Sequence, residues 1–237
     1  MGHSSSRPRK ADEFPLGKCQ TPKNGVCASR PCTCRHEGSE LKIHKHKLKI
    51  AFILPGELVL RGMDIDLALL REMHRRLPPE VALAMVGRAA LALERNGHSP
   101  GVGMRADVGR VVRRCVLSWP KADLSQVDQH DENRITEDGA EAVALAVAHR
   151  HRGWCVVRRM QREEHADWLL EVRGKSHRRI IALEVSGVDR GSIAARLSQR
   201  LAQVAMSVDV DARWAGVVGF EEPTMAMRST RRGKRGN

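Results

Sequence analysis

The chain of 237 residues contains no tyrosine and few other aromatic residues, with three Phe and four Trp. Because proteins that bind single-stranded nucleic acid commonly stack bases on aromatic side chains, this scarcity argues against that mode of recognition. The most apolar early run, residues 50–60, contains Pro55, Gly56 and Glu57, whereas a membrane-spanning helix needs roughly 20 apolar residues. The N-terminus lacks the apolar core of a secretory signal. We therefore expect a soluble, cytoplasmic protein without a membrane partner.

The net charge of +13 lies almost entirely near the two ends of the chain. Residues 1–50 hold 11 Lys and Arg against 4 Asp and Glu, and residues 228–237 hold five basic residues and no acid. Residues 51–227 are nearly balanced, with 25 basic and 24 acidic residues. Flexible basic tails attract phosphates in a salt-sensitive, sequence-independent way, which is compatible with DNA as a partner. The alternative is that the tails only keep the chain soluble.

Residues 1–62 differ in composition from the rest, since seven of the ten lysines lie in residues 1–50. Four of the six cysteines also lie there, followed by a histidine: Cys19, Cys27, Cys32, Cys34 and then His36. Thiolates and imidazole can bind zinc, but this spacing lacks the paired C-x-x-C arrangement of common zinc sites. We predict a disordered leader over residues 1–62. Zinc binding is one alternative, and translation from Met63 is another.

Residues 63–120 carry the pattern of two helices followed by a β-hairpin. Apolar residues recur at helical spacing between 64 and 77, and Pro79 can occupy the first position of a second helix. Two strand-like runs then flank a turn at Gly109. Residues 121–134 are polar and are interpreted as a linker.

Residues 135–222 predict a domain with the element order αβββαβ. A helix capped by Thr136 leads into three strand-like runs, and a second helix begins after Ser192 and precedes a final apolar strand. The four strand-like runs span residues 154–160, 166–172, 179–186 and 214–220. A helix between the last two strands permits a parallel crossover. We expect an α+β protein with an α/β core, in which residues 223–237 are a basic disordered tail.

One carboxylate lies on each of two adjacent predicted strands. Asp167 begins one apolar run and Glu184 lies near the end of the next, so an antiparallel hairpin brings both to the same edge of the sheet. A lone charge in a buried strand is costly, which marks Glu184 as a functional candidate. Paired carboxylates suit Mg²⁺ or Mn²⁺, and such an ion can promote phosphodiester cleavage. Glu141, on the preceding helix, is placed to orient metal-bound water.

This arrangement resembles the PD-(D/E)XK nuclease superfamily, which has the restriction-endonuclease-like fold, over residues 135–222. The resemblance rests on the αβββαβ order, on Asp167, and on Glu184-Val185-Ser186 in the place of the E-x-K motif. It implies that the two acids bind the metal ion. The string TEDGAEAVAL…GW…DWLL…LEVSG, within residues 136–187, also looks like a family of uncharacterised bacterial proteins that carry an LEVSG signature. This similarity implies no activity.

The resemblance assigns further roles and contains one departure. It implies that Glu141 assists catalysis and that a glutamine of the following helix, Gln199 or Gln203, takes part. The lysine of the motif is replaced by Ser186, whose hydroxyl can bond a neighbouring carboxylate but cannot supply a positive charge. The lysine of this region, Lys175, lies in the turn between the two strands. The candidate catalytic residues are therefore Glu141, Asp167, Glu184 and Ser186.

The sequence supports three hypotheses of function, since fold alone does not choose between them. The first is a Mg²⁺-dependent endonuclease that acts on DNA. Its candidate basic rim consists of Arg158, Arg159, Arg162, Arg178 and Arg179. The second is a catalytically inactive domain of the same fold that binds nucleic acid or protein, with its carboxylates paired to arginines. The third is an assembly subunit unrelated to nucleic acid.

Overall fold

The structure is a computed structural model that describes residues 60–122, 131–174, 177–207 and 209–230. All of these residues belong to the unit Ala51–Asn237. Residues 1–59 of the leader predicted over 1–62, among them the cysteine zinc site, lie outside the described residues, as do Lys175 and residues 231–237. The leader prediction is wrong at its end, because residues 60–62 belong to the strand Leu60–Asp66.

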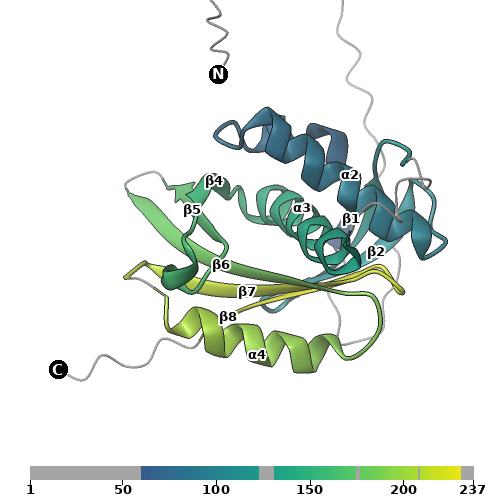
Figure 1. Cartoon of the computed structure of the whole chain (residues 1–237). Coiled ribbons are helices and arrows are strands. Elements are labelled where there is room, and N and C mark those ends of the chain that lie inside the picture. The colour runs from purple at the N-terminus through teal and green to yellow at the C-terminus, as the bar shows by residue number, and fades with distance from the viewer. Residues whose placement is uncertain (1–59, 123–130, 175–176, 208, 231–237) are drawn as a thin grey trace, which may run out of the picture. The chain divides into compact units, whose positions relative to one another are not determined.

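An eight-stranded mixed sheet organises the described residues (Figure 1). Its strands are β1 (Leu60–Asp66), β2 (Val102–Val108), β3 (Val111–Ser118), β4 (Cys155–Arg159), β5 (Trp168–Arg173), β6 (Arg178–Val188), β7 (Ala212–Gly219) and β8 (Thr224–Ser229). They lie in the order β1-β3-β2-β8-β7-β6-β5-β4. The pairs β1–β3, β2–β8 and β6–β7 are parallel, and the other neighbours are antiparallel.

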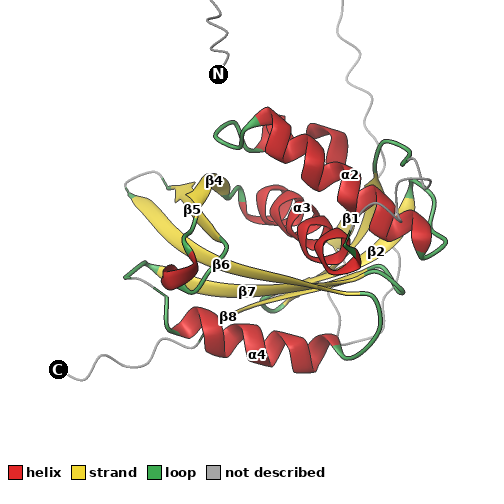
Figure 2. Cartoon of the chain, viewed as in Figure 1, coloured by secondary structure: helices red, strands yellow, loops and turns green. Residues whose placement is uncertain are grey.

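Helices cover both faces of this sheet, as Figure 2 shows. The α-helices are α1 (Leu70–Met73), α2 (Pro79–Arg95), α3 (Glu132–Arg152) and α4 (Ile193–Ala205). Helices α2 and α3 lie over one face, and α4 packs on β6, β7 and β8 from the other. One hydrophobic core lies on the α2 and α3 side and a smaller one on the α4 side. No helix in the described ranges is long and apolar enough to cross a membrane.

Residues 135–222 have the predicted order of elements, α3-β4-β5-β6-α4-β7, and α4 makes the predicted parallel crossover between β6 and β7. The α+β class is therefore confirmed. Helix α3 begins earlier than predicted, because the carboxylate of Asp131 caps it by accepting a hydrogen bond from Asn133 N at 2.8 Å. Thr136, the predicted cap, lies inside the helix, where its hydroxyl donates to the carbonyl of Glu132.

The first predicted helix, residues 64–77, is wrong at its start. Residues 64–66 belong to β1, which pairs in parallel with β3. The chain becomes helical only after Asp66, whose side chain accepts a hydrogen bond from Ala68 N. Pairing within the sheet outweighs a local helical periodicity here. Helix α2 and the β2–β3 hairpin form as predicted.

The tail predicted from residue 223 is also wrong at its start, because residues 224–229 form β8. This strand lies between β2 and β7, and the side chains of Met225 and Met227 on it are fully buried. Two inward-facing methionines are too short a pattern to distinguish a strand from a tail. The segments that the sequence separates at the predicted 121–134 linker thus share one sheet.

Candidate functional site

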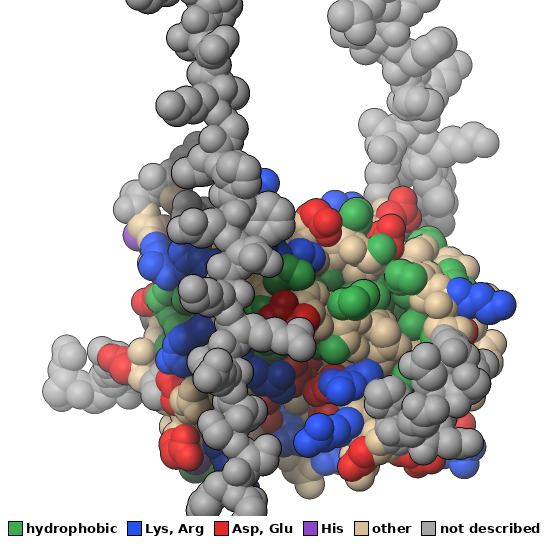
Figure 3. Space-filling model, turned by 45° about the horizontal axis from the view of Figure 1, so that its top comes forward, with side chains coloured by type: hydrophobic (Ala, Val, Ile, Leu, Met, Phe, Trp, Pro, Cys, Tyr) green, Lys and Arg blue, Asp and Glu red, His purple; other side chains and the backbone are tan. Residues whose placement is uncertain are grey.

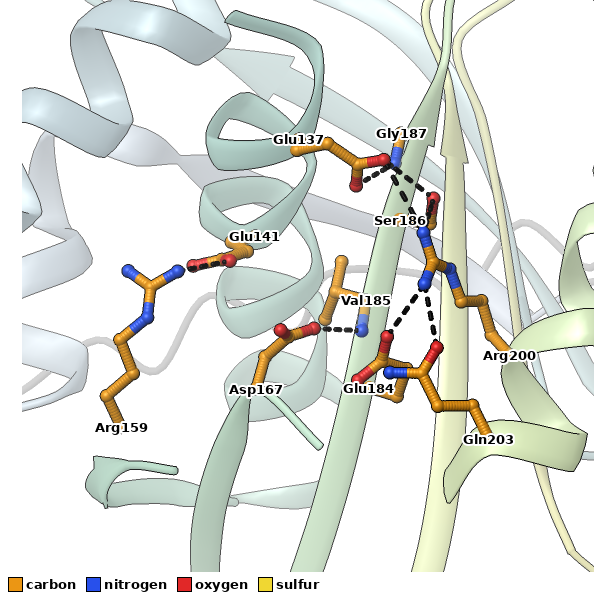
Figure 4. Close-up of polar contacts among 10 residues, drawn as sticks. All are labelled: Glu137, Glu141, Arg159, Asp167, Glu184, Val185, Ser186, Gly187, Arg200 and Gln203. Atoms are coloured by element: carbon orange, nitrogen blue, oxygen red, sulfur yellow. Dashed lines mark hydrogen bonds and ion pairs between the residues drawn. The ribbon is translucent and has the colours of Figure 1, made fainter. Parts of the chain in front are cut away.

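The site forms where β5 ends and one edge of β6 is left open. Strand β5 begins at Trp168, which pairs with Leu183, and the part of β6 beyond it pairs within the described residues with β7 on its other side. Two carboxylates bond the main-chain N–H groups of this open edge (Figure 4). Asp167 accepts from Val185 N at 2.7 Å. Edge N–H groups need partners, so these acids have a structural task besides any chemical one.

The second of these carboxylates, Glu137, belongs to α3 and accepts from Gly187 N at 3.1 Å. The approach of α3 to β6 depends on Gly187 having no side chain. A Cβ atom there would lie 2.3 Å from the carbonyl oxygen of Thr136, far inside contact distance. The glycine of the LEVSG string therefore has a packing reason, which is to let α3 bring its acids to the strand edge.

Four carboxylates meet at this edge, as Figure 4 shows. Glu137 and Glu141 lie one turn apart on α3, Asp167 directly precedes β5, and Glu184 lies on β6. Glu141 and Glu184 are 5% and 2% exposed. The sequence thus predicted the convergence of Glu141, Asp167 and Glu184 correctly, and it missed Glu137.

The buried acids hold their protons more tightly than free carboxyl groups do. Burial, together with the neighbouring Asp167 carboxylate, raises the pKa of Glu184 to about 8. The same two causes raise the pKa of Glu141 to about 8. Burial also raises the pKa of Asp167. A site with these values attracts either protons or a metal cation.

Glu184 and Glu141 differ in how their oxygens are satisfied. Glu141 accepts hydrogen bonds on both, from Arg159 Nη2 at 2.9 Å and from Trp168 Nε1 at 3.1 Å. Glu184 Oε2 is buried and has no hydrogen-bond partner among the described residues. A buried oxygen of this kind beside a second carboxylate requires a proton or a cation. Glu184 is therefore the better candidate for a metal ligand. Glu141 lies in the same cluster with its position fixed by Arg159 and Trp168.

The donor set fits a hard divalent cation that is only partly enclosed by protein. Mg²⁺ is commonly held by one or two carboxylates and completes its shell with water and substrate phosphates. Asp167 and Glu184 supply such a pair. Within the described ranges no group of three or more His, Cys, Asp or Glu side chains is placed to hold a metal ion. A closed site of the structural zinc type is thus not formed by these residues.

Arg200 of α4 is a second residue that sequence reasoning missed. Its Nη1 donates to Glu184 Oε1 at 3.1 Å and to Gln203 Oε1 at 2.8 Å. Its Nη2 donates to Ser186 Oγ at 3.3 Å. Gln203, one of the two predicted glutamines, thus contacts the site through Arg200, whereas Gln199 is exposed. The available signal was helical spacing, since Arg200 lies three residues before Gln203.

Ser186 occupies the position of the missing lysine and is fully buried. Its hydroxyl donates to Glu137 Oε1 at 3.0 Å, which confirms the expectation that it bonds a neighbouring carboxylate. The same hydroxyl accepts from Arg200. The guanidinium group of Arg200 therefore contacts the side chain at this position.

The predicted arginine rim is made largely of paired side chains. Arg158 forms an ion pair with Glu164, Arg159 with Glu141, and Arg178 with Glu171. Arg162 and Arg179 are exposed. On the face seen in Figure 3, basic side chains are interspersed with acidic ones rather than forming a continuous basic surface.

No family model matches this chain, and no curated protein or solved structure does so either. The geometry of the site and the order of the elements are therefore the basis for inferring function.

Proposed function

We propose that this protein is a metal-dependent nuclease with a restriction-endonuclease-like, PD-(D/E)XK-type domain, which hydrolyses phosphodiester bonds of DNA. Asp167 and Glu184 hold Mg²⁺ or Mn²⁺. The observation that carries the proposal is the buried Oε2 of Glu184, which lies beside a second carboxylate and accepts no hydrogen bond from any residue that the structure describes. A divalent cation supplies the charge that this pair lacks.

The arrangement of residues 135–222 supports the choice of reaction. The order α3-β4-β5-β6-α4-β7 is the order on which the resemblance to this superfamily rests. Asp167 lies at the start of β5 and Glu184 on β6, the two positions at which the superfamily carries its metal-binding acids. The resemblance and the acid pair together favour phosphodiester hydrolysis over other metal-assisted reactions.

Each residue of the site has a definite task in this reaction. The bound cation would polarise the phosphate and lower the pKa of a water molecule. Glu141, held by Arg159 and Trp168, would orient metal-bound water next to Asp167. Arg200 supplies the positive charge that Ser186 cannot, and it stabilises the charge that builds up on the phosphate. Hydrolysis places the water oxygen on phosphorus and a proton on the leaving oxygen.

A second candidate function is a catalytically inactive module of the same fold that binds nucleic acid or protein. Two observations favour it: Arg200 pairs with Glu184 at 3.1 Å, and Arg159 pairs with Glu141 at 2.9 Å. Arginine-paired carboxylates are what such a module would have. Against this module, Arg200 bonds one oxygen of Glu184, and within the described part of the chain no donor reaches the other, which leaves it open to a cation or a proton.

Calorimetric titration of the full chain with Mn²⁺ and Mg²⁺ tests the proposal. We expect binding by the wild type and its loss in Glu184→Gln. Glu171→Gln is the matched control, since Glu171 is also buried, lies on the adjacent strand β5 and pairs with Arg178. This control should bind as the wild type does. Mg²⁺-dependent cleavage of plasmid DNA should likewise occur in the wild type and in Glu171→Gln and be lost in Glu184→Gln.

Two results would count against the nuclease. A folded wild type that binds neither ion, with or without a short DNA duplex, contradicts the metal site. Metal binding that depends on Glu184 but supports no cleavage of duplex or single-stranded DNA favours the inactive module.

A further inference from the structure

Arg200 and the proposed metal ion require the same carboxylate. The guanidinium group donates to Glu184 Oε1, and the other oxygen of that carboxylate faces the Asp167 side, where none of the described residues donates to it. A divalent cation between Asp167 and Glu184 would therefore lie within a few ångströms of a fixed positive charge. Like charges at such a distance in a buried site repel strongly.

Arg200 has other anchors that do not depend on Glu184. Gln203 accepts from its Nη1 at 2.8 Å, and Ser186 accepts from its Nη2 at 3.3 Å. The carboxylate of Glu137 lies 3.7 Å from Nη2. The Arg200 side chain is 23% exposed, so one side of it reaches solvent. These contacts can hold the guanidinium near the strand edge after it has left Glu184.

We propose that Arg200 is an exchangeable counter-ion of this site. Without metal it neutralises Glu184, and on metal binding it gives up that carboxylate, stays anchored on Gln203 and Ser186, and binds the phosphate of the substrate. The inference rests on the proposed function, and it adds that one side chain both restrains metal binding and contacts the phosphate. Ser186 and Gln203 thereby become positioning residues for Arg200.

A purely structural role for Arg200 makes a different prediction. If the guanidinium only stabilised the fold, its removal would weaken metal binding and cleavage together. The exchange predicts that metal affinity rises while the cleavage rate falls. Removal of Arg200 takes away the cation that competes with the metal ion, and it also takes away the side chain that contacts the phosphate.

The test is Mn²⁺ titration of the full chain without DNA, followed by cleavage of plasmid DNA. Arg200→Gln should bind Mn²⁺ roughly tenfold more tightly than the wild type and Arg200→Lys about equally. Cleavage by Arg200→Gln should fall by roughly 100-fold or more. Arg178→Gln is the matched control, because it removes a positive charge that is paired with a different buried carboxylate, Glu171, at the other end of the β5–β6 pair. This control should change Mn²⁺ affinity by less than about threefold.

The outcomes separate this inference from the proposed function. Equal or weaker Mn²⁺ binding by a folded Arg200→Gln overturns the exchange, and it leaves the nuclease proposal standing if wild-type binding depends on Glu184. A wild type that binds no Mn²⁺ with or without a short DNA duplex, beside an Arg200→Gln variant that binds it through Glu184, shows that metal does not displace Arg200. That result overturns both the exchange and an active nuclease. Absence of binding in both proteins without DNA overturns the exchange, and it overturns the nuclease as well if the duplex restores no binding.

Discussion

Glu184 shows at the level of a single residue why a buried charge is informative. A lone acid within the apolar run of β6 is costly unless something compensates it. The described residues supply only part of that compensation, since Arg200 bonds one oxygen and none of them donates to the other. Glu141 is equally buried but has both oxygens bonded. The cost of burial thus predicted Glu184, whereas Glu141 was inferred from its place on the preceding helix and from the resemblance. The difference between the two residues depends on partners that are distant in the sequence.

The raised pKa values predict how stability depends on pH in metal-free buffer. The pKa of Glu184 rises from 4.5 to about 8 in the folded protein. A carboxyl group with a raised pKa favours the folded state below its unfolded pKa, and this contribution is lost as pH rises through the folded value. The free energy of unfolding should therefore fall between about pH 4.5 and about pH 8. Glu184→Gln should flatten this fall, as measured by denaturant titration across that range.

Glu164→Gln is the control for this pH dependence. Its carboxylate is partly exposed to solvent, and hydrogen bonds from Arg158 and from the main chain of Gln161 hold its pKa at about 2. Substitution there should leave the slope between about pH 4.5 and about pH 8 unchanged. A Glu184→Gln protein with the same slope as the wild type would show that the Glu184 carboxyl group ionises normally.

The residues of the site come together at the open edge of β6. Strand edges expose N–H groups that need acceptors, and here Asp167 and Glu137 supply them at Val185 and Gly187. The hairpin pattern predicted that Asp167 and Glu184 meet. It did not predict that β6 extends past the start of β5, because strand ends are set by pairing across the sheet. The open edge therefore became visible only once the register of β5 and β6 was known.

Substitutions at Asp167 separate its structural task from its chemical one. Asp167→Asn keeps an oxygen that can accept from Val185 N, so its unfolding free energy near about pH 8 should match or exceed that of the wild type. Asp167→Ala leaves this buried donor without a partner and should cost roughly 1–3 kcal/mol. Both variants should lose Mn²⁺ binding in calorimetry. Retained binding in Asp167→Asn would exclude the carboxylate as a ligand.

The molecule as a whole is joined by β8. This strand connects β2 of the first predicted segment with β7 of the second, and α2 packs on α3 above the same sheet. The sequence divided these segments because a polar stretch lies between them and because β8 follows the last clear apolar run. Neither signal reports which strands become neighbours.

Truncation tests the role of β8 in the whole sheet. A chain that ends after Pro223 lacks Met225 and Met227, both fully buried, and loss of each buried methionine costs roughly 2–5 kcal/mol. We expect such a chain to lose cooperative unfolding, measured by tryptophan fluorescence in denaturant. A chain that ends after Thr230 keeps β8 and should unfold as the full chain does. Equal stability of the two truncated chains would contradict this role.

Residue patterns alone were sufficient for the α+β class, for the order of elements in residues 135–222 and for the meeting of Asp167 with Glu184. Each of these follows from local periodicity or from the cost of a charge in an apolar strand. Only the fold revealed the contacts of Arg200, the hydrogen bond from Gly187 N to Glu137, and the place of β8 in the sheet. They join segments far apart in the chain, and their positions depend on how helices pack across the sheet, which no local pattern encodes.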